Sequence, residues 1–331
     1  MIGAAMRRRE FITLIGGAAI AWPLTARAQQ PAMVRKVGFV YAGPKAAAVS
    51  RGEAIISGLR AGGYPAPTQV ELVIRAAEGD PTRIASLTEE IIAQDVNVFI
   101  ASGPSILNEA HRATRTIPIV AIDLETDPVA NGLAVALARP GGNVTGVFLD
   151  FPDFTTKWIE LLVECIPKLS RIAVLWDPTT GSVQMESVKK AAELLKIQLD
   201  ISEVRTTSNF DEAFSVANQR SAGAMVLLSS PVIAPNVQML AELASRHRLP
   251  AITLFPDFAR EGGLLAYGPN LLGLYRRTGV LAAKVLAGAK PAERPIERPT
   301  KFELVLNMRT ATALNLSIPA SLLLRADEVI E

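Results

Sequence analysis

The feature that most constrains the fold of this chain is a repeated alternation of short β-branched segments with longer amphipathic ones. Such alternation is typical of strand–helix units that form a parallel sheet. It runs over residues 36–122 and again over residues 171–254. We therefore predict an α/β fold with two doubly wound parallel-sheet lobes.

Two local matches indicate that the halves correspond segment by segment. Residues 98–104 parallel residues 225–231, and residues 117–121 parallel residues 249–253. In each half a strand ends in serine followed closely by proline, a helix follows, and proline opens the next strand. A proline is tolerated at the first residue of a strand because no ladder hydrogen bond is lost.

The same patterns give the expected bounds of the elements. Strands are expected at residues 36–41, 69–74, 96–101, 117–122, 171–176, 198–204, 224–228, 250–254, 264–267 and 302–306. Helices are expected at residues 52–61, 81–94, 105–114, 182–195, 210–219, 234–245 and 271–287, with shorter helical segments at residues 161–166 and 258–261. The last strand, helix and strand belong to no third domain, so we expect three crossover strands between the lobes. Lobe 1 would comprise residues 29–125 with 260–300, and lobe 2 would comprise residues 126–259 with 301–331.

Residues 1–28 have the pattern of a cleaved export signal. Arginines at positions 7–9 precede an apolar run at 11–22, and Ala26-Arg27-Ala28 has the small side chains that signal peptidase requires. We expect cleavage after Ala28 and a mature protein that is soluble in the periplasm. The alternative is a membrane anchor, but about 12 apolar residues fall short of the roughly 20 that span a bilayer.

The export route is open between two pathways. Arg8-Arg9-Glu10-Phe11-Ile12 resembles the twin-arginine (Tat) core, although Thr13 stands where a lysine is common. The Sec route remains the alternative. Residues 1–28 carry four arginines and one glutamate, so the net charge of +2 becomes −1 without them.

The composition excludes several classes of function. A single cysteine, Cys165, can form neither an internal disulfide nor a zinc cluster. The basic residues are scattered and the aromatic residues few, which argues against nucleic-acid binding. The two histidines, His111 and His247, are flanked by Arg112, Arg246 and Arg248, which indicates a solvated helix face. Because no cofactor-binding motif is present either, we expect no cofactor, no bound metal and no enzyme activity.

Several segments resemble the tryptophan/tyrosine-type ABC transporter substrate-binding proteins, which have the type 1 periplasmic binding fold. The matching segments are residues 8–12, 117–120, 127–129, 139–147, 299–307 and 318–330, of which Arg139-Pro140-Gly141-Gly142-Asn143-Val144-Thr145-Gly146 is the most specific. The resemblance implies two lobes, capture of a small organic solute such as an amino acid by hinge closure, and delivery to an inner-membrane ABC permease. We expect a monomer. A sensory receptor of the same fold and an enzyme on a doubly wound fold are the alternatives.

The strand ends of lobe 1 supply the first candidate ligand contacts. Ser102 and Ser105 flank the start of a helix, where free N–H groups and hydroxyls would stabilise a carboxylate. The resemblance implies the same, because this loop is similar to the carboxylate clamp of amino-acid binders. Ser102 and Ser105 could instead simply cap the helix. The next strand brings Ala121 and Asp123 to the same edge.

The strand ends of lobe 2 supply the second set. Ser229 follows one strand, and Asp177 and Asp257 follow two others. Either aspartate could pair with a ligand ammonium. The alternatives are an Asp-Pro turn at Asp177 and a helix cap at Asp257.

Two aromatic residues occupy equivalent positions in the lobes. Tyr41 and Trp176 each end the first strand of their half. Together they could enclose an apolar or aromatic ligand group. Alternatively, each packs on the core of its own lobe.

Overall fold

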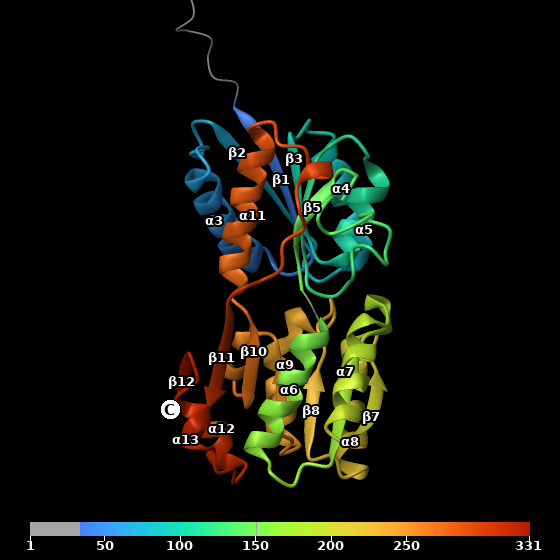
Figure 1. Ribbon diagram of the computed structural model, residues 1–331, viewed down its shortest axis with the longest axis vertical. Coiled ribbons are helices and arrows are strands. Elements are labelled where there is room, and N and C mark those ends of the chain that lie inside the picture. Colours follow the sequence, from blue (N-terminus) through green and yellow to red (C-terminus); the bar gives the residue numbers. More distant parts are fainter. Residues whose placement is uncertain (1–33, 150) are drawn as a thin grey trace, which may run out of the picture. The chain divides into compact units, whose positions relative to one another are not determined.

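Figure 1 shows the computed structural model, which describes residues 34–149 and 151–331. Residues 35–331 form one unit that contains a five-stranded and a seven-stranded sheet. The expected export signal at residues 1–28 lies outside the described residues. Within the described ranges, no helix combines the length and the apolar character needed to cross a membrane.

The first sheet is entirely parallel, in the order β2-β1-β3-β4-β5. Successive side chains of a strand point to opposite faces, so Val37 and Phe39 pack in one core and Val40 packs in another. Helices α3 and α11 cover the first face, and α4 and α5 cover the second (Figure 1). The elements are β1 (Arg35–Tyr41), α3 (Lys45–Ala61), β2 (Val70–Ala76), α4 (Ile84–Ile92), β3 (Val98–Ser102), α5 (Pro104–Ala113), β4 (Ile119–Asp123), β5 (Val144–Phe148) and α11 (Leu271–Leu286).

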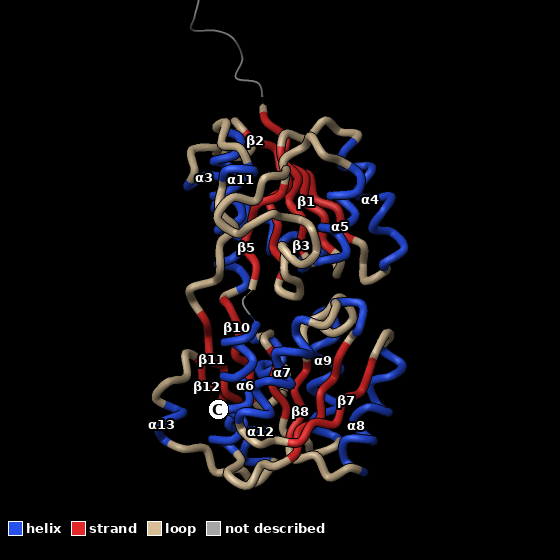
Figure 2. Tube along the Cα trace, turned by 45° about the vertical axis from the view of Figure 1, so that its right-hand side comes forward, coloured by secondary structure: helices blue, strands red, loops and turns tan. Residues whose placement is uncertain are grey.

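The second sheet has the order β12-β11-β10-β9-β8-β6-β7 and is parallel except where β10 meets β11. In Figure 2, where strands are red, the strands of the two sheets form two separate groups. Its strands are β6 (Arg171–Trp176), β7 (Gln198–Glu203), β8 (Ala224–Leu227), β9 (Ala251–Thr253), β10 (Leu265–Pro269), β11 (Phe302–Asn307) and β12 (Glu328–Ile330). Its helices are α6 (Phe151–Cys165), α7 (Val183–Leu194), α8 (Phe210–Gln219), α9 (Val237–Arg246), α10 (Pro256–Arg260), α12 (Met308–Ala313) and α13 (Ala320–Leu323).

The chain passes between the two sheets three times, as expected. It leaves the first sheet after β5, returns between β10 and α11, and leaves again before β11. The positions of the crossings correct the expected lobe boundaries. Because β5 belongs to the first sheet and β10 to the second, residues 126–148 go with lobe 1 and residues 260–269 with lobe 2.

All ten expected strands are present, with bounds that agree to within two residues. Strands β5 and β12 and helices α12 and α13 were not expected. Helix α3 begins at Lys45 rather than at residue 52. Its first turns are rich in alanine, a strong helix former that gives no apolar periodicity. This longer helix carries Arg51, which matters for the site.

Candidate functional site

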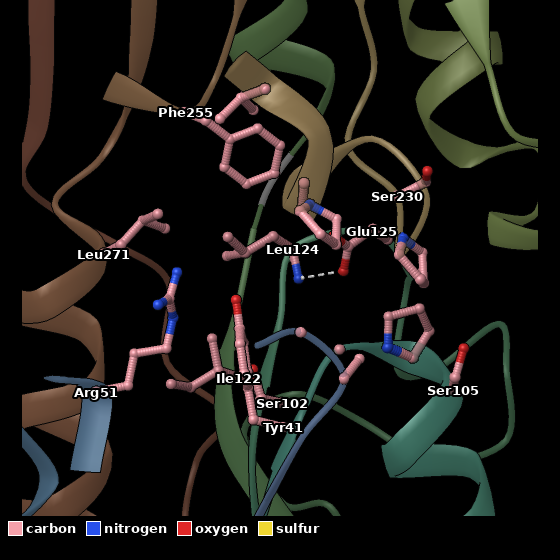
Figure 3. A pocket seen from close by; sticks show the side chains of 18 of the residues that line it. Tyr41, Arg51, Ser102, Ser105, Ile122, Leu124, Glu125, Ser230, Phe255 and Leu271 are labelled. Atoms are coloured by element: carbon pink, nitrogen blue, oxygen red, sulfur yellow. Dashed lines mark hydrogen bonds between the residues drawn. The ribbon is translucent and has the colours of Figure 1, made fainter. Parts of the chain in front are cut away.

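A cavity lies at the carboxyl ends of strands from both sheets, where doubly wound sheets bind ligands. Residues at the ends of β1, β3 and β4 line it from the first sheet, and residues that follow β8 and β9 line it from the second. Side chains of α3 and α11 complete the lining. Figure 3 shows Arg51 on the Leu271 side of this cavity and Glu125 on the Ser230 side.

Among the described residues, Arg51 is the one basic side chain that lines the cavity. Its guanidinium carbon lies 4.5 Å from the ring centroid of Tyr41 and 5.5 Å from that of Tyr275, an arrangement that stabilises a cation. One terminal nitrogen donates to the Ala47 carbonyl at 3.1 Å. The buried Nε has no hydrogen-bond partner in the described part of the chain. Carboxylates commonly bind arginine through two N–H groups at once. The Nε–H of Arg51 is therefore an unused donor for a carboxylate.

The start of α5 faces the same cavity. Gly103 has a φ of 85°, which glycine adopts readily, and Pro104 occupies the first helical turn, where no N–H is needed. The hydroxyls of Ser102 and Tyr275 lie 2.6 Å apart. Because a helix start presents free N–H groups and a positive dipole end, this segment and Arg51 together suit a carboxylate.

The tyrosine hydroxyls beside Arg51 remain neutral. Burial raises the pKa of Tyr41 to about 12, and Tyr275 adds to this shift. Burial likewise raises the pKa of Tyr275. Neither phenol therefore neutralises the guanidinium at physiological pH.

Glu125 brings a buried carboxyl group to the cavity. Glu125 lines the cavity, and only 7% of the residue is exposed. The Ser229 hydroxyl, from the loop after β8, donates to Glu125 Oε1. Burial, together with the neighbouring Asp123, raises the pKa of Glu125 to about 8.

The rest of the lining is largely apolar. Ile122, Leu124 and Phe255 are almost completely buried, and Leu271 and Val237 are partly buried. Three prolines, at positions 104, 231 and 235, add rigid apolar surface. The cavity therefore offers one cation, one buried acid and an apolar wall.

Four of the predicted contact residues line this cavity: Tyr41, Ser102, Ser105 and Asp257. The Asp257 side chain is 65% exposed and pairs with Arg260 at 3.0 Å. Asp257 does not cap its helix, because Phe255 occupies the N-cap position of α10.

The other predicted residues lie elsewhere. Ala121 and Asp123 are fully buried, and Ser229 bonds to Glu125 beneath the surface of the cavity. Asp177 accepts from the Thr179 backbone and hydroxyl, as an Asp-Pro turn predicts, and lines a neighbouring cavity. Trp176 is absent from the lining, so Tyr41 and Trp176 do not enclose this cavity between them.

Three ionisable residues of the cavity lining were not predicted: Arg51, Glu125 and Tyr275. Arg51 and Tyr275 lie on helices, and only the fold brings them to the strand ends. Glu125 lies two residues past the end of β4. Its place in the loop that follows a strand of the sheet is the sequence signal that points to it.

No metal site accompanies the cavity. In the described ranges, no three His, Cys, Asp or Glu side chains are placed to hold an ion.

Comparison with known proteins decides the family. The sequence model of the family described as "ABC transporter substrate binding protein" matches residues 36–330. The chain belongs to this family. Its members bind solutes for transport and are not enzymes, which confirms the expected family and class of function.

Individual relatives are more distant. A "Tyrosine-binding protein" of Clostridioides difficile is 24% identical over 268 residues, 79% of this chain and 75% of that protein. A crystal structure described as an ABC domain in complex with L-Trp, from Streptococcus pneumonia, has a TM-score of 0.82 at 24% identity and covers 90% of this chain and 100% of its own. A conserved domain protein of Vibrio cholerae also has a TM-score of 0.82, at 23% identity, and covers 89% and 99%. These likenesses confirm the two-lobed type 1 fold of this substrate-binding protein.

Proposed function

We propose that this substrate-binding protein serves an ABC importer and captures an L-amino acid with an apolar or aromatic side chain. The observation that carries the proposal is the placement of Arg51 and the α5 N-terminus in a cavity that is otherwise mostly apolar. The carboxylate would bind Arg51 and the Ser102 loop. The side chain would pack on Ile122, Phe255 and Leu271. The tyrosine and tryptophan named for two relatives support a solute of this class.

The proposal includes closure of the lobes on the solute. Residues of both sheets line the cavity, so a bound solute would contact both at once. Lobes joined by a few crossing segments can rotate about them. The closed, loaded receptor would then dock on an inner-membrane permease. We propose that the receptor acts as a monomer, since opposite walls of the cavity come from the two sheets of the same chain.

A ligand panel tests the proposal. Aromatic L-amino acids should raise the melting temperature of the mature protein, residues 29–331, because a ligand at about 100 times its Kd adds about 2.7 kcal/mol to the stability. Phenylpropionate, which lacks the ammonium group, and sugars are the matched controls. Differential scanning fluorimetry gives the shifts, and small-angle scattering of the same samples should show a smaller radius of gyration. A shift with sugars alone would refute the proposed solute class.

We also propose that residues 1–28 direct export to the periplasm and are removed after Ala28. A fusion of residues 1–35 to a reporter should reach the periplasm. The double change Arg8→Lys and Arg9→Lys should abolish its export if the twin-arginine route is used. Fractionation of cells with an antibody to the reporter measures this. Export that persists in the double variant would exclude the twin-arginine route and indicate export through the Sec route.

A further inference from the structure

Two buried carboxyl groups lie next to each other at the wall of the cavity: Glu125 belongs to the lining, and Asp123 does not reach it. Glu125 Oε1 accepts from Ser229 across the two sheets, and Oε2 accepts from the Leu124 N–H at 3.2 Å. Asp123 is 0% exposed. It accepts from the N–H groups of Glu125 and Thr126 at 2.9 and 3.1 Å and from the Thr126 hydroxyl at 2.5 Å.

In the part of the chain that the structure describes, no cation offsets these two groups. Within the described ranges, neither carboxylate has a lysine, arginine or histidine nitrogen within 4.0 Å. Two unpaired carboxylates buried side by side are strongly unfavourable, so one of them keeps its proton. Burial raises the pKa of Asp123 as well, but three donors oppose that shift by stabilising its ionised form, and we therefore place the proton on Glu125.

The other ionisable groups around the cavity do not change this assignment. They are Arg51, Tyr41, Tyr275 and Asp257. Arg51 stacks on the tyrosine rings, and both phenols are neutral. Asp257 is exposed and paired with Arg260. The pair formed by Glu125 and Asp123 therefore has no positively charged partner among the described groups around the cavity.

We propose that Glu125 is the residue that selects the ammonium group of the solute, and that it releases its proton to solvent when that group binds. The inference rests on the proposed function and names the second anchor of the same site. One N–H···O bond forms between the ammonium and Glu125, the carboxyl O–H bond breaks, and the buffer takes the proton. The ammonium is the cation that the pair of carboxyl groups lacks.

The direction of the pH dependence follows from the free protein. Burial and Asp123 raise the pKa of Glu125 to about 8, while the Ser229 bond opposes this shift. Below pH 8 the empty receptor must lose a proton to bind, so affinity should rise about tenfold per pH unit toward that value. An ammonium in contact lowers the pKa of a carboxyl group, so the bound form stays ionised well below pH 8. Affinity should level off above pH 8 until the solute ammonium itself loses its proton.

Titration calorimetry of the unmodified mature protein tests this inference. L-Tryptophan, L-tyrosine and L-phenylalanine are titrated at pH 6.5 in buffers with different ionisation enthalpies. We expect close to one proton released per solute bound. Binding without proton release would overturn the inference and leave the proposed function standing. Failure of all three to bind would overturn the proposed function and, with it, this inference.

A pair of variants assigns the proton to one residue. Glu125→Gln keeps the shape of the side chain, and should weaken binding about 10- to 100-fold, the scale of a charged hydrogen bond. It should also remove the proton release and flatten the pH dependence. The control is Glu90→Gln, which removes an exposed acid that pairs with Arg75 away from the cavity and should leave affinity and proton release unchanged. Asp257→Asn tests the other acid of the cavity, and proton release should persist in this variant because Glu125 is intact. The reverse pattern would make Asp257 the ammonium partner and overturn the proposal.

Discussion

Replacement of Arg51 by methionine should weaken binding of an aromatic L-amino acid by about two to three orders of magnitude. Arg51 is the one basic side chain in the described lining, and its buried Nε has no hydrogen-bond partner among the described residues. Two charged hydrogen bonds to a carboxylate contribute about 3 to 4 kcal/mol together, and each 1.4 kcal/mol is about a factor of ten in Kd. Isothermal titration of the mature protein measures the loss.

The control for this variant is Arg51→Lys. Lysine keeps the positive charge but lacks the planar pair of donors, and its ammonium is less suited to stacking on Tyr41. We expect a loss of about tenfold, smaller than that of Arg51→Met. The thermal stability of the empty variants shows whether either substitution unfolds the protein. An affinity for Arg51→Met within threefold of the unmodified protein would mean that the solute carboxylate binds elsewhere.

Most of the strands could be predicted because they are short, apolar, β-branched runs between helices. Strand β5 breaks this rule, since a long irregular segment separates it from β4. Gly146 within β5 would place a side-chain carbon 2.1 Å from the Ala121 carbonyl oxygen, so only glycine lets the two strands approach here. A glycine within a five-residue run weakens the strand pattern. The lobe boundaries were misplaced as a result.

The residues of the candidate site also fall into two groups, those that the sequence predicts and those that only the fold brings together. Tyr41, Ser102 and Ser105 could be predicted because ligands of doubly wound sheets bind at strand ends. Arg51 and Tyr275 could not, because the packing of α11 on α3 places them together and no local pattern reports that packing. Trp176 is absent from the cavity lining for a different reason. It is equivalent to Tyr41 by position in its strand, but equivalent positions in two sheets need not face one cavity.

The close packing of α3 on α11 leads to the second large effect. An alanine at Gly58 would place its Cβ 1.9 Å from the Arg276 carbonyl oxygen, a backbone atom of α11. At Gly279 of α11 a Cβ would lie 2.1 Å from the Ile55 carbonyl oxygen of α3. The two helices therefore touch backbone to backbone through these glycines. This contact holds Tyr275 of α11 beside Arg51 of α3.

Gly58→Ala should therefore lower the free energy of unfolding by about 3 kcal/mol, at the upper end of the cost of overpacking a core. The gain in helix propensity, about 1 kcal/mol, does not offset an overlap that requires a whole helix to move. Gly52→Ala in the same helix is the matched control. Its Cβ would meet the end of the Ile74 side chain at 2.5 Å, and that methyl group can turn away. In urea denaturation, Gly52→Ala should leave the free energy of unfolding nearly unchanged. Gly58→Ala should also bind the solute more weakly, because α11 shifts. Equal stability of the two variants would show that α11 moves away from α3 without cost, and that the glycine contact does not set the position of Tyr275.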